Sequence, residues 1–304
     1  MIPMTILIVL ILVFLVVKRI IDHTFRRRER PERSEYLQFK DVKDEYSPEL
    51  IKFRSGENML QGYLLGGENT KGLVVVVHGL GAGAEGYLAE ILYFVTQGYQ
   101  VFAYDNTGYH LSEGKNSVGL PQAVEDLDAA LDFIEGEARF AKLPVYLFGH
   151  SWGGYSVGAI LNFNHKVKAV ASLSGFSNPN KMIFEWAKRL MGVFAYAIAP
   201  FMYLHQRILF GNKLDITAVD GINKSGVPVL LVHGSEDKTV RIDGSAIISC
   251  KGEITNPNVQ YLLWEKENQN GHMDILYDAQ NHERRSKVNE ELMGKIVEFY
   301  ESAE

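Results

Sequence analysis

A run of five apolar residues at positions 73–77, LVVVV, is the feature that most restricts the fold of this chain. A strand with one face in water alternates apolar and polar residues, whereas a continuous β-branched run predicts a strand buried on both faces. Such a strand needs a sheet with helices on both sides. The chain must therefore supply further strands and the helices that cover them.

Apolar runs and helical patterns follow this strand in alternation. The runs predicted to be strands are residues 101–104, 145–148, 167–173, 229–232 and 259–264. The segments predicted to be helices are residues 85–97, 123–135, 155–161 and 290–300. This alternation predicts an α/β fold with a mostly parallel sheet flanked by helices. Residues 50–65, with apolar runs on either side of Ser-Gly-Glu-Asn, predict a β-hairpin before it.

Length and composition exclude some classes of protein. With 304 residues the chain is long enough for one large α/β domain with a full core. A net charge of −6 gives no indication of nucleic-acid binding. Cys250 is the only cysteine, so neither a disulfide framework within the chain nor a multi-cysteine metal site is possible.

The N-terminus differs in composition from the rest of the chain. Residues 1–17 carry no charge. The basic residues that follow are Lys18, Arg19, Arg26, Arg27, Arg28, Arg30 and Arg33. A membrane span needs roughly 17–25 apolar residues, and Ile20 and Ile21 extend this one because the basic residues before them can snorkel. The pattern predicts an N-terminal transmembrane helix at residues 1–21. A cleaved signal peptide is the alternative, but it would have basic residues before the apolar run and a small-residue cleavage site after it.

The basic residues also indicate an orientation. Lysine and arginine after a first span favour the cytoplasmic side for the segment that carries them. We therefore expect a single-pass membrane protein whose folded domain faces the cytoplasm. Residues 22–48 are charged and predict a linker, and residues 49–304 predict the folded domain. The basic residues are also placed to contact anionic lipid headgroups.

The alternation breaks at residues 176–226, between the strands at 167–173 and 229–232. Much of this insertion is helical in tendency and apolar on most sides. Its uncharged stretch, residues 190–204, is short for a membrane span, and Pro200 interrupts it. We expect an inserted, apolar helical lid. A membrane-inserted segment is the alternative.

A serine between glycines follows the strand at 145–148. Residues 149–154 read GHSWGG, so Ser151 stands between a buried strand and the next helix. Gly-x-Ser-x-Gly in that setting predicts a nucleophile elbow, a sharp turn that exposes the serine hydroxyl. The glycines suit a turn in which side chains would collide with the neighbouring strand and helix. A purely structural turn is the alternative.

A serine hydroxyl is a weak nucleophile and needs a general base that a carboxylate orients. Behind an elbow of this kind the acid and then the histidine follow the serine along the chain. Asp237 lies in the loop after the strand at 229–232, and His272 lies in the loop after the strand at 259–264. Both loops belong to the carboxyl edge of the predicted sheet, where such sheets place functional residues.

Other residues of the same types compete with these two. Glu236 is adjacent to Asp237 and would point elsewhere, and Asp243 lies further into the next segment. His282 is the other late histidine, at the approach to the last helix. His150, next to the serine, is expected to be structural or to line the pocket. The residues expected to be hydrogen-bonded at strand ends are His78, His233 and Asp105.

A glycine-rich segment supplies the remaining requirement, a site for the oxyanion. Residues 78–83, HGLGAG, follow the first long strand. We predict that the backbone N–H groups of Leu80 and Trp152 form the oxyanion hole, each contributing on the order of 3 kcal/mol to the barrier reduction. A phosphate-binding glycine loop is the alternative, but no Gly-Lys-Ser/Thr follows.

Together these segments resemble the α/β-hydrolase superfamily over roughly residues 50–302. The segments that carry the resemblance are HGLGAG (78–83), YDNTGYHLSEG (104–114), GHSWGG (149–154), HGSEDKTV (233–240) and GHMD (271–274). The chain looks most like the serine-aminopeptidase and monoacylglycerol-lipase-like branch, whose members carry a lid after the sixth strand of the family's sheet. The resemblance implies Ser151, Asp237 and His272 as a catalytic triad. Residues 105–108 read DNTG where related chains often have Asp-x-Arg-Gly.

These observations predict a membrane-anchored serine hydrolase that cleaves a carboxylic ester through an acyl-enzyme on Ser151, without a metal or organic cofactor. The apolar lid and the anchor favour a lipid-like or monoacylglycerol-like acyl substrate. The lid residues that could line a channel for it are Phe184, Trp186, Phe194, Tyr196, Phe201 and Tyr203. The alternatives are a serine peptidase that acts on short peptides and a catalytically inactive, hydrolase-like binding module.

Overall fold

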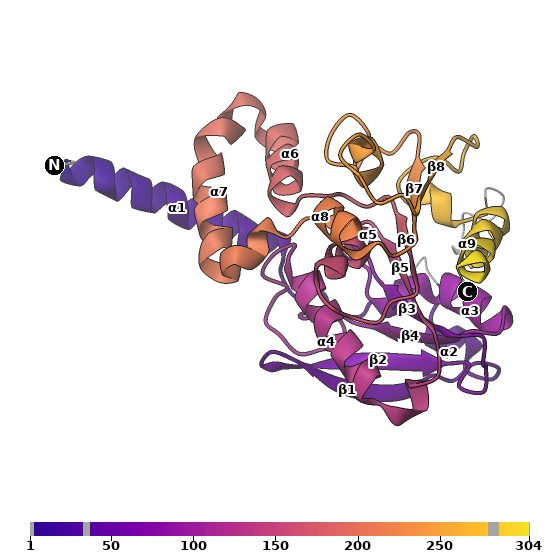
Figure 1. The fold of residues 1–304 in the computed structure, drawn as a ribbon. Coiled ribbons are helices and arrows are strands. Elements are labelled where there is room, and N and C mark those ends of the chain that lie inside the picture. Colours follow the sequence, from indigo (N-terminus) through magenta and orange to yellow (C-terminus); the bar gives the residue numbers. More distant parts are fainter. Residues whose placement is uncertain (1–2, 33–36, 279–285, 304) are drawn as a thin grey trace.

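An eight-stranded sheet, in the order β1-β2-β4-β3-β5-β6-β7-β8, forms the centre of the computed structural model (Figure 1). The structure describes residues 3–32, 37–278 and 286–303. The strands are β1 (Glu49–Ser55), β2 (Asn58–Leu65), β3 (Leu73–Val77), β4 (Gln100–Tyr104), β5 (Val145–His150), β6 (Ala169–Leu173), β7 (Val229–Gly234) and β8 (Val259–Trp264). β2 pairs antiparallel with β1 and β4, and all other pairs are parallel. The predicted hairpin and the mostly parallel sheet are confirmed.

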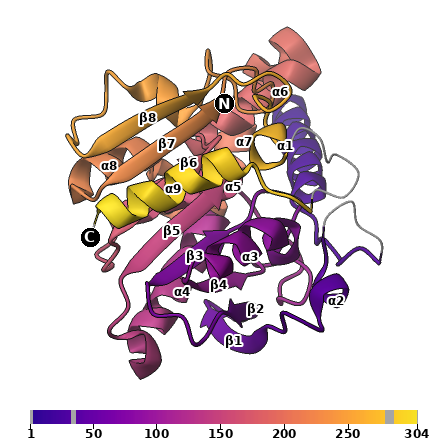
Figure 2. The same ribbon diagram turned by 90° about the vertical axis from the view of Figure 1, so that its right-hand side faces the viewer.

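Helices cover both faces of the sheet (Figure 2). The helices are α1 (Met4–Thr24), α2 (Phe39–Val42), α3 (Leu88–Thr96), α4 (Gln122–Gly136), α5 (Trp152–Ala159), α6 (Pro179–Met191), α7 (Ala195–Phe210), α8 (Ala218–Ser225) and α9 (Glu290–Ser302). α3 and α9 pack on one face, and α4, α5 and α8 pack on the other. The valines of β3 alternate between the two cores, Val74 and Val76 toward α3 and Val75 and Val77 toward α5. This explains the continuous apolar run, because both faces of β3 are buried.

The insertion between β6 and β7 forms α6, α7 and α8. Asn178 caps α6, since its side chain accepts hydrogen bonds from the backbone N–H groups of Asn180 and Lys181. Gly192 follows α6, and α7 continues through Pro200. α6 and α7 form a helical hairpin beyond the edge of the sheet's body (Figure 1). We refer to α1, α6 and α7 together as the anchor–lid unit, because α7 packs against α1.

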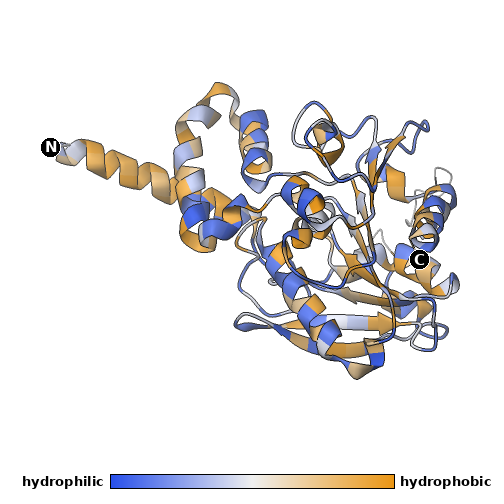
Figure 3. Ribbon diagram, viewed as in Figure 1, coloured by the Kyte–Doolittle hydropathy of each residue, from blue (hydrophilic) through white to orange (hydrophobic). Residues whose placement is uncertain are grey.

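α1 extends away from the body of the molecule (Figure 1). Along most of its length its residues are apolar (Figure 3) and exposed, whereas Val17 and Ile21 are buried against the domain. Among the described residues it is the one helix long and apolar enough to cross a membrane, a criterion that a signal sequence also meets. Its 21 residues span about 31 Å, close to the thickness of a bilayer's hydrocarbon core.

The charged segment that follows α1 is docked on the domain along part of its length. Arg28 N–H donates to the carbonyl of Gly108 (2.9 Å), and its carbonyl accepts from His110 N–H (2.7 Å). The Arg27 guanidinium donates to the carbonyls of Ser112 and His110 (2.9 and 2.7 Å). These contacts hold the end of α1 against the loop after β4.

Candidate active site

Ser151 occupies a sharp turn between β5 and α5. Its φ is +57° and its ψ is −111°, a conformation that residues with a side chain rarely adopt. Such backbone strain costs on the order of 1–3 kcal/mol and is found mainly at functional sites. The Ser151 N–H donates to the carbonyl of Leu173 (2.8 Å), which ties the turn to β6. The geometry is that of a nucleophile elbow.

The glycines around Ser151 are needed because the backbone segments come very close together. A Cβ on Gly153 would collide with the carbonyl oxygen of Val77, and a Cβ on Gly149 would collide with the carbonyl oxygen of Gly153. Both distances would be much shorter than a van der Waals contact. A Cβ on Gly154 would be 2.7 Å from the carbonyl oxygen of Leu173. Only glycine lets α5 start directly against β3 and β6, and this close approach holds the serine at the edge of the sheet.

His272 and Asp237 meet Ser151 at this edge. His272 Nε2 is 2.9 Å from Ser151 Oγ, and His272 Nδ1 is 2.7 Å from Asp237 Oδ2. Because a carboxylate only accepts hydrogen bonds, Nδ1 carries the proton and Nε2 is left to accept the serine hydroxyl proton. The structure therefore brings together the serine, the histidine and the acid that the sequence places in three separate loops.

Asp237 is buried and is held by several donors. Its Oδ1 accepts from the backbone N–H groups of Thr239 (2.8 Å) and Val240 (2.9 Å). Burial acts to raise the pKa of Asp237, but hydrogen bonds from His233 and His272 outweigh it and hold the pKa below its ordinary value. The carboxylate therefore stays ionised, as orientation of the His272 ring requires.

His233 has a role that its position in the sequence does not reveal. It is buried near the end of β7, and its Nε2 donates to the carbonyl of Val240 (2.8 Å), as expected of a hydrogen-bonded histidine. The same nitrogen is 3.3 Å from Asp237 Oδ2. His233 therefore supports the acid as well as the loop, and the spacing of four residues between the two is the only signal in the sequence.

His150 links the elbow to the loop that carries His272. Its Nε2 donates to the carbonyl of His272 (2.8 Å), and its Nδ1 accepts from the hydroxyl of Tyr87 (2.8 Å). Tyr87 in turn accepts from Gly79 N–H (3.0 Å). Burial lowers the pKa of His150 to about 3, so the ring is neutral, as this chain of bonds requires. The expectation of a structural histidine is confirmed, and the structure adds the loop that it supports.

The glycine-rich turn after β3 lies beside the elbow. A Cβ on Gly79 would be 3.4 Å from Ser151 Cβ. The N–H groups on either side of Leu80 are held by tyrosines, Gly79 by Tyr87 and Gly81 by Tyr109 (2.9 Å). These bonds set the direction of the turn. The turn thus places Gly79, the residue before Leu80, beside Ser151, and the oxyanion hole at Leu80 stays a prediction.

Trp152, the other predicted donor, is the first residue of α5. A backbone N–H in the first turn of a helix has no acceptor within that helix, and the helix dipole favours negative charge there. Its indole is buried and donates to the carbonyl of Leu120 (2.7 Å), which fixes the residue in place. The backbone N–H remains at the helix start, next to the serine.

The competing residues have other partners. Asp105 accepts from Tyr63 Oη (2.8 Å) and Ala84 N–H (2.9 Å), so it holds a loop as expected. His78 accepts from Asn106 N–H (3.0 Å) and is buried. Of the remaining candidates, Glu236 is exposed and Asp243 pairs with Arg241. His282 lies outside the described residues.

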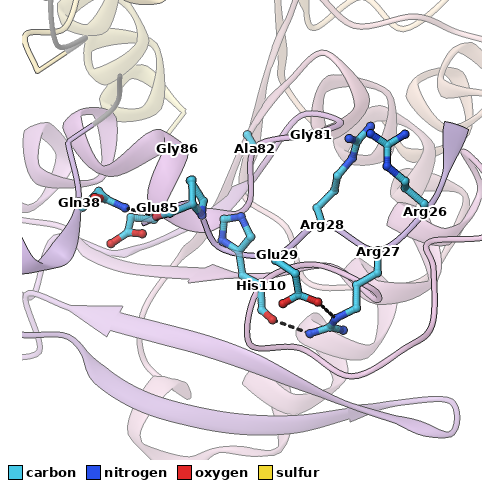
Figure 4. A pocket seen from close by; sticks show the side chains of 11 residues that line it. Arg26, Arg27, Arg28, Glu29, Gln38, Gly81, Ala82, Glu85, Gly86 and His110 are labelled. Carbon is cyan, nitrogen blue, oxygen red and sulfur yellow. Dashed lines mark hydrogen bonds and ion pairs between the residues drawn. The ribbon is translucent and has the colours of Figure 1, made fainter. Parts of the chain in front are cut away.

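Three cavities border Leu80, Gly81 and His272. The first, of about 330 Å³, is almost entirely apolar and lies between α1, α6, α7 and Leu80. The second, of about 380 Å³, lies on the Gly81 side of the same turn and is lined by Arg26, Arg27 and Arg28 (Figure 4). The third, of about 770 Å³, borders His272. Its acidic lining residues are Glu236, Glu265, Glu267 and Asp274.

Comparison with known proteins gives the family. The model of the S33 serine aminopeptidase family matches residues 68–218, which include Ser151 and end before Asp237. An esterase of Pyrococcus furiosus has the same fold, with a TM-score of 0.65 and 15% identity over 91% of this chain and 98% of that structure. The chain belongs to the α/β-hydrolase superfamily. The α/β-hydrolase fold thus accounts for the elbow and for the order of the three residues.

Curated relatives of this α/β hydrolase match it over only part of their length. An uncharacterised peptidase of Bacillus subtilis is 26% identical over 53% of this chain and 61% of its own length. A monoglyceride lipase of Saccharomyces cerevisiae is 23% identical over 57% of this chain and 56% of its own length. The matches thus span little more than half of each relative. They include both a peptidase and a lipase, so they do not choose between the two substrate classes.

Proposed function

We propose that this α/β hydrolase is a membrane-anchored serine hydrolase that cleaves carboxylic esters of lipid type. The observation that carries the proposal is the chain of hydrogen bonds from Ser151 Oγ through His272 to Asp237. A serine hydroxyl 2.9 Å from an imidazole nitrogen, with an ionised carboxylate behind the ring, has the groups that nucleophilic attack on a carbonyl needs.

The reaction follows from the positions of these groups. His272 Nε2 takes the hydroxyl proton as Ser151 Oγ attacks the carbonyl carbon, and the resulting oxyanion lies between the N–H groups of Leu80 and Trp152. His272 then gives the proton to the leaving alcohol, and an acyl-enzyme remains on Ser151. Water, deprotonated by His272, attacks the acyl-enzyme and releases the acid. Asp237 stabilises the imidazolium in both halves of the reaction.

The surroundings of the site support a lipid-type ester. The apolar cavity next to Leu80 is built from the lid and from α1, so an acyl group would leave water on binding. In the predicted orientation α1 anchors the protein with its N-terminus outside, and the folded domain faces the cytoplasm. Protease treatment of intact cells should therefore leave the domain undigested, and digestion would contradict this orientation.

A fluorophosphonate probe tests the proposed nucleophile directly. We expect the full-length protein in detergent to be labelled and the Ser151→Ala variant to stay unlabelled. The neighbouring Ser156→Ala variant is the matched control, because its hydroxyl bonds to the carbonyl of Gly153 within α5 and should not matter for labelling. Failure to label the wild type would favour a non-catalytic binding module.

A second candidate, peptide hydrolysis, is favoured by the acidic cavity beside His272. The cavity is lined by four carboxylates and one lysine, Lys238. This negative charge would attract the protonated amine of a short peptide. The lid carboxylate Glu185 is not available for this, since it accepts from Ser245 Oγ (2.9 Å). Rates on p-nitrophenyl esters of two to sixteen carbons, compared with aminoacyl p-nitroanilides, distinguish the two. Faster cleavage of the anilides would overturn the lipid assignment.

A further inference from the structure

The apolar cavity beside the active site is closed on one side by the membrane helix. Five of its lining residues come from α1 and its C-terminal end: Val17, Ile20, Ile21, Thr24 and Phe25. The lid supplies the opposite wall, including Trp186 and Met202. The hydroxyl of Thr24 donates to the carbonyl of Ile20 (2.9 Å), so it does not add a polar group to the cavity. The cavity would be open to water if α1 were absent.

The cavity is lined by Leu80, whose backbone N–H is one of the two proposed oxyanion donors. At the inner end Val17 and Ile21 are buried, and Leu80 joins the wall. At the outer rim Leu190 is 83% exposed and Ile20 is 47% exposed. The rim therefore faces the same surroundings as the apolar face of α1. For a helix that lies in a membrane, these surroundings are lipid.

We propose that the last turns of α1 form one wall of the acyl-binding site, so that the anchor also selects the substrate. The occupant is the acyl chain of a membrane-resident lipid, which enters from the bilayer between Ile20 and Leu190. Transfer from lipid into this cavity avoids exposing the chain to water. The inference rests on the proposed esterase activity and names its substrate class.

The test narrows the cavity from the α1 side. The Ile21→Trp variant of the full-length protein, in detergent micelles, should lower the ratio of kcat/KM for a sixteen-carbon p-nitrophenyl ester to that for the acetate by roughly tenfold or more. Leu12→Trp, on an exposed part of α1 outside the cavity, is the matched control and should leave the ratio unchanged. An unchanged ratio in Ile21→Trp overturns the proposal.

A variant at the rim covers the case in which Ile21→Trp does not fold. Leu190→Trp adds bulk at a largely exposed position and should lower the same ratio. An unchanged ratio there also counts against lateral entry. Absence of both labelling and acetate hydrolysis in the wild type is a different result, because it contradicts the proposed function and not the acyl site.

A separate observation concerns the arginines just after α1. Arg27 pairs with Glu29 (2.6 Å) and donates to backbone carbonyls, and Arg30 Nε donates to Glu85 (2.7 Å). Arg26 donates to the carbonyl of His23 (3.2 Å). Arg26 and Arg28 line the same 380 Å³ cavity, and neither has a carboxylate partner within the described ranges. The Nε of Arg28 is buried without a hydrogen-bond acceptor in this part of the structure. Figure 4 shows the two guanidinium groups extending in the same direction, beside Gly81.

We infer that Arg26 and Arg28 bind a phosphate-type anion. The two carboxylates that line the cavity, Glu29 and Glu85, pair with Arg27 and Arg30. The guanidinium groups of Arg26 and Arg28 are therefore left to bind the oxygens of a phosphate, and the Nε–H of Arg28, unpaired in the described part of the chain, supplies one donor. The anion comes from a lipid headgroup or from free phosphate. If the anion is a lipid headgroup, it would lie on one side of the Leu80–Gly81 turn, and the apolar cavity lies on the other side.

Thermal unfolding tests this site without relying on turnover. In the Ser151→Ala background, micelles that contain lysophosphatidylglycerol should raise Tm relative to micelles that contain monoacylglycerol. The increase should disappear in Arg26→Gln/Arg28→Gln and persist in Lys142→Gln, an exposed control that also loses one positive charge. A rise with inorganic phosphate as well points to free phosphate as a ligand. No rise with either probe, or a rise that survives in the double variant, overturns the inference.

Discussion

The elbow region and the anchor–lid unit are stabilised by different interactions. Around Ser151 the polar groups are buried and bound to one another, as His150 and Asp237 show. In the anchor–lid unit large apolar side chains are exposed, and Phe194 at the tip of the lid is 70% exposed. The first arrangement is preorganised and complete within the chain. The second exposes apolar surface, which is typical of regions that contact a protein partner, a ligand or a membrane.

Removal of the buried acid should have the largest effect on activity. We expect Asp237→Asn to lower kcat on p-nitrophenyl acetate by about 10⁴-fold, because the amide no longer holds His272 in the tautomer that accepts the serine proton. Asp243→Asn, at an exposed residue paired with Arg241, is the matched control and should change kcat less than about twofold. A drop of less than tenfold in Asp237→Asn would show that another group orients the imidazole.

Two glycine substitutions compare the packing of the two regions. Gly153→Ala puts a methyl group against the carbonyl of Val77 and should destabilise the fold by about 3 kcal/mol. Gly192→Ala lies between α6 and α7, where a Cβ meets nothing within 4 Å, and only its φ of +58° is unfavourable. We expect a cost of about 1 kcal/mol there. Thermal unfolding in detergent measures both, and equal costs would mean that the lid is packed as tightly as the elbow.

Within the described part of the chain, the carboxylate of Glu90 is an exception to the rule that buried polar groups have hydrogen-bond partners. Glu90 on α3 is fully buried, neither of its carboxylate oxygens has a hydrogen-bond partner among the described residues, and burial raises its pKa from 4.5 to about 8. Between these values the folded state keeps a proton that the unfolded state releases, so stability falls as pH rises from about 4.5 to 8.

We therefore expect Glu90→Gln to raise Tm at pH 8 and to flatten the dependence of Tm on pH. The gain at pH 8 should be on the order of 1–3 kcal/mol. Glu298→Gln, at an exposed position on α9, is the control and should leave the pH dependence as it is in the wild type. If Tm falls with pH as much in Glu90→Gln as in the wild type, other titratable groups cause the pH dependence of stability.

The smallest expected effect is at the tip of the lid. Phe194→Ser removes apolar surface that is exposed in water and should weaken binding of the lid to vesicles by about 1 kcal/mol, or roughly fivefold in KM for a vesicle-bound ester. Leu50→Ser, at an exposed leucine on β1, is the matched control. An unchanged KM in Phe194→Ser would mean that the tip of the lid does not enter the membrane surface.

The sheet was predictable from the sequence because each central strand is buried on both faces. β3 has the predicted bounds, 73–77, since burial leaves no position for a polar residue. The sequence predicts the body of α5 at residues 155–161, whereas Gly153 and Gly154 before it disfavour a helix by propensity. Tertiary contacts override that preference, and α5 begins at Trp152. The charged segment predicted as a linker includes residues 25–28, whose contacts with the loop after β4 no local pattern indicates.

The sequence by itself determined the α/β alternation, the glycines of the elbow and the order of serine, acid and histidine, because these depend on local spacing. Tertiary structure alone decided which histidines support the triad, since His150 and His233 reach His272 and Asp237 only after the loops converge at the sheet edge. It also decided that α1 closes a cavity against α7, about 180 positions away. Which surface an apolar face packs against depends on the shape and the proximity of the two surfaces in the folded chain. The local sequence predicts neither.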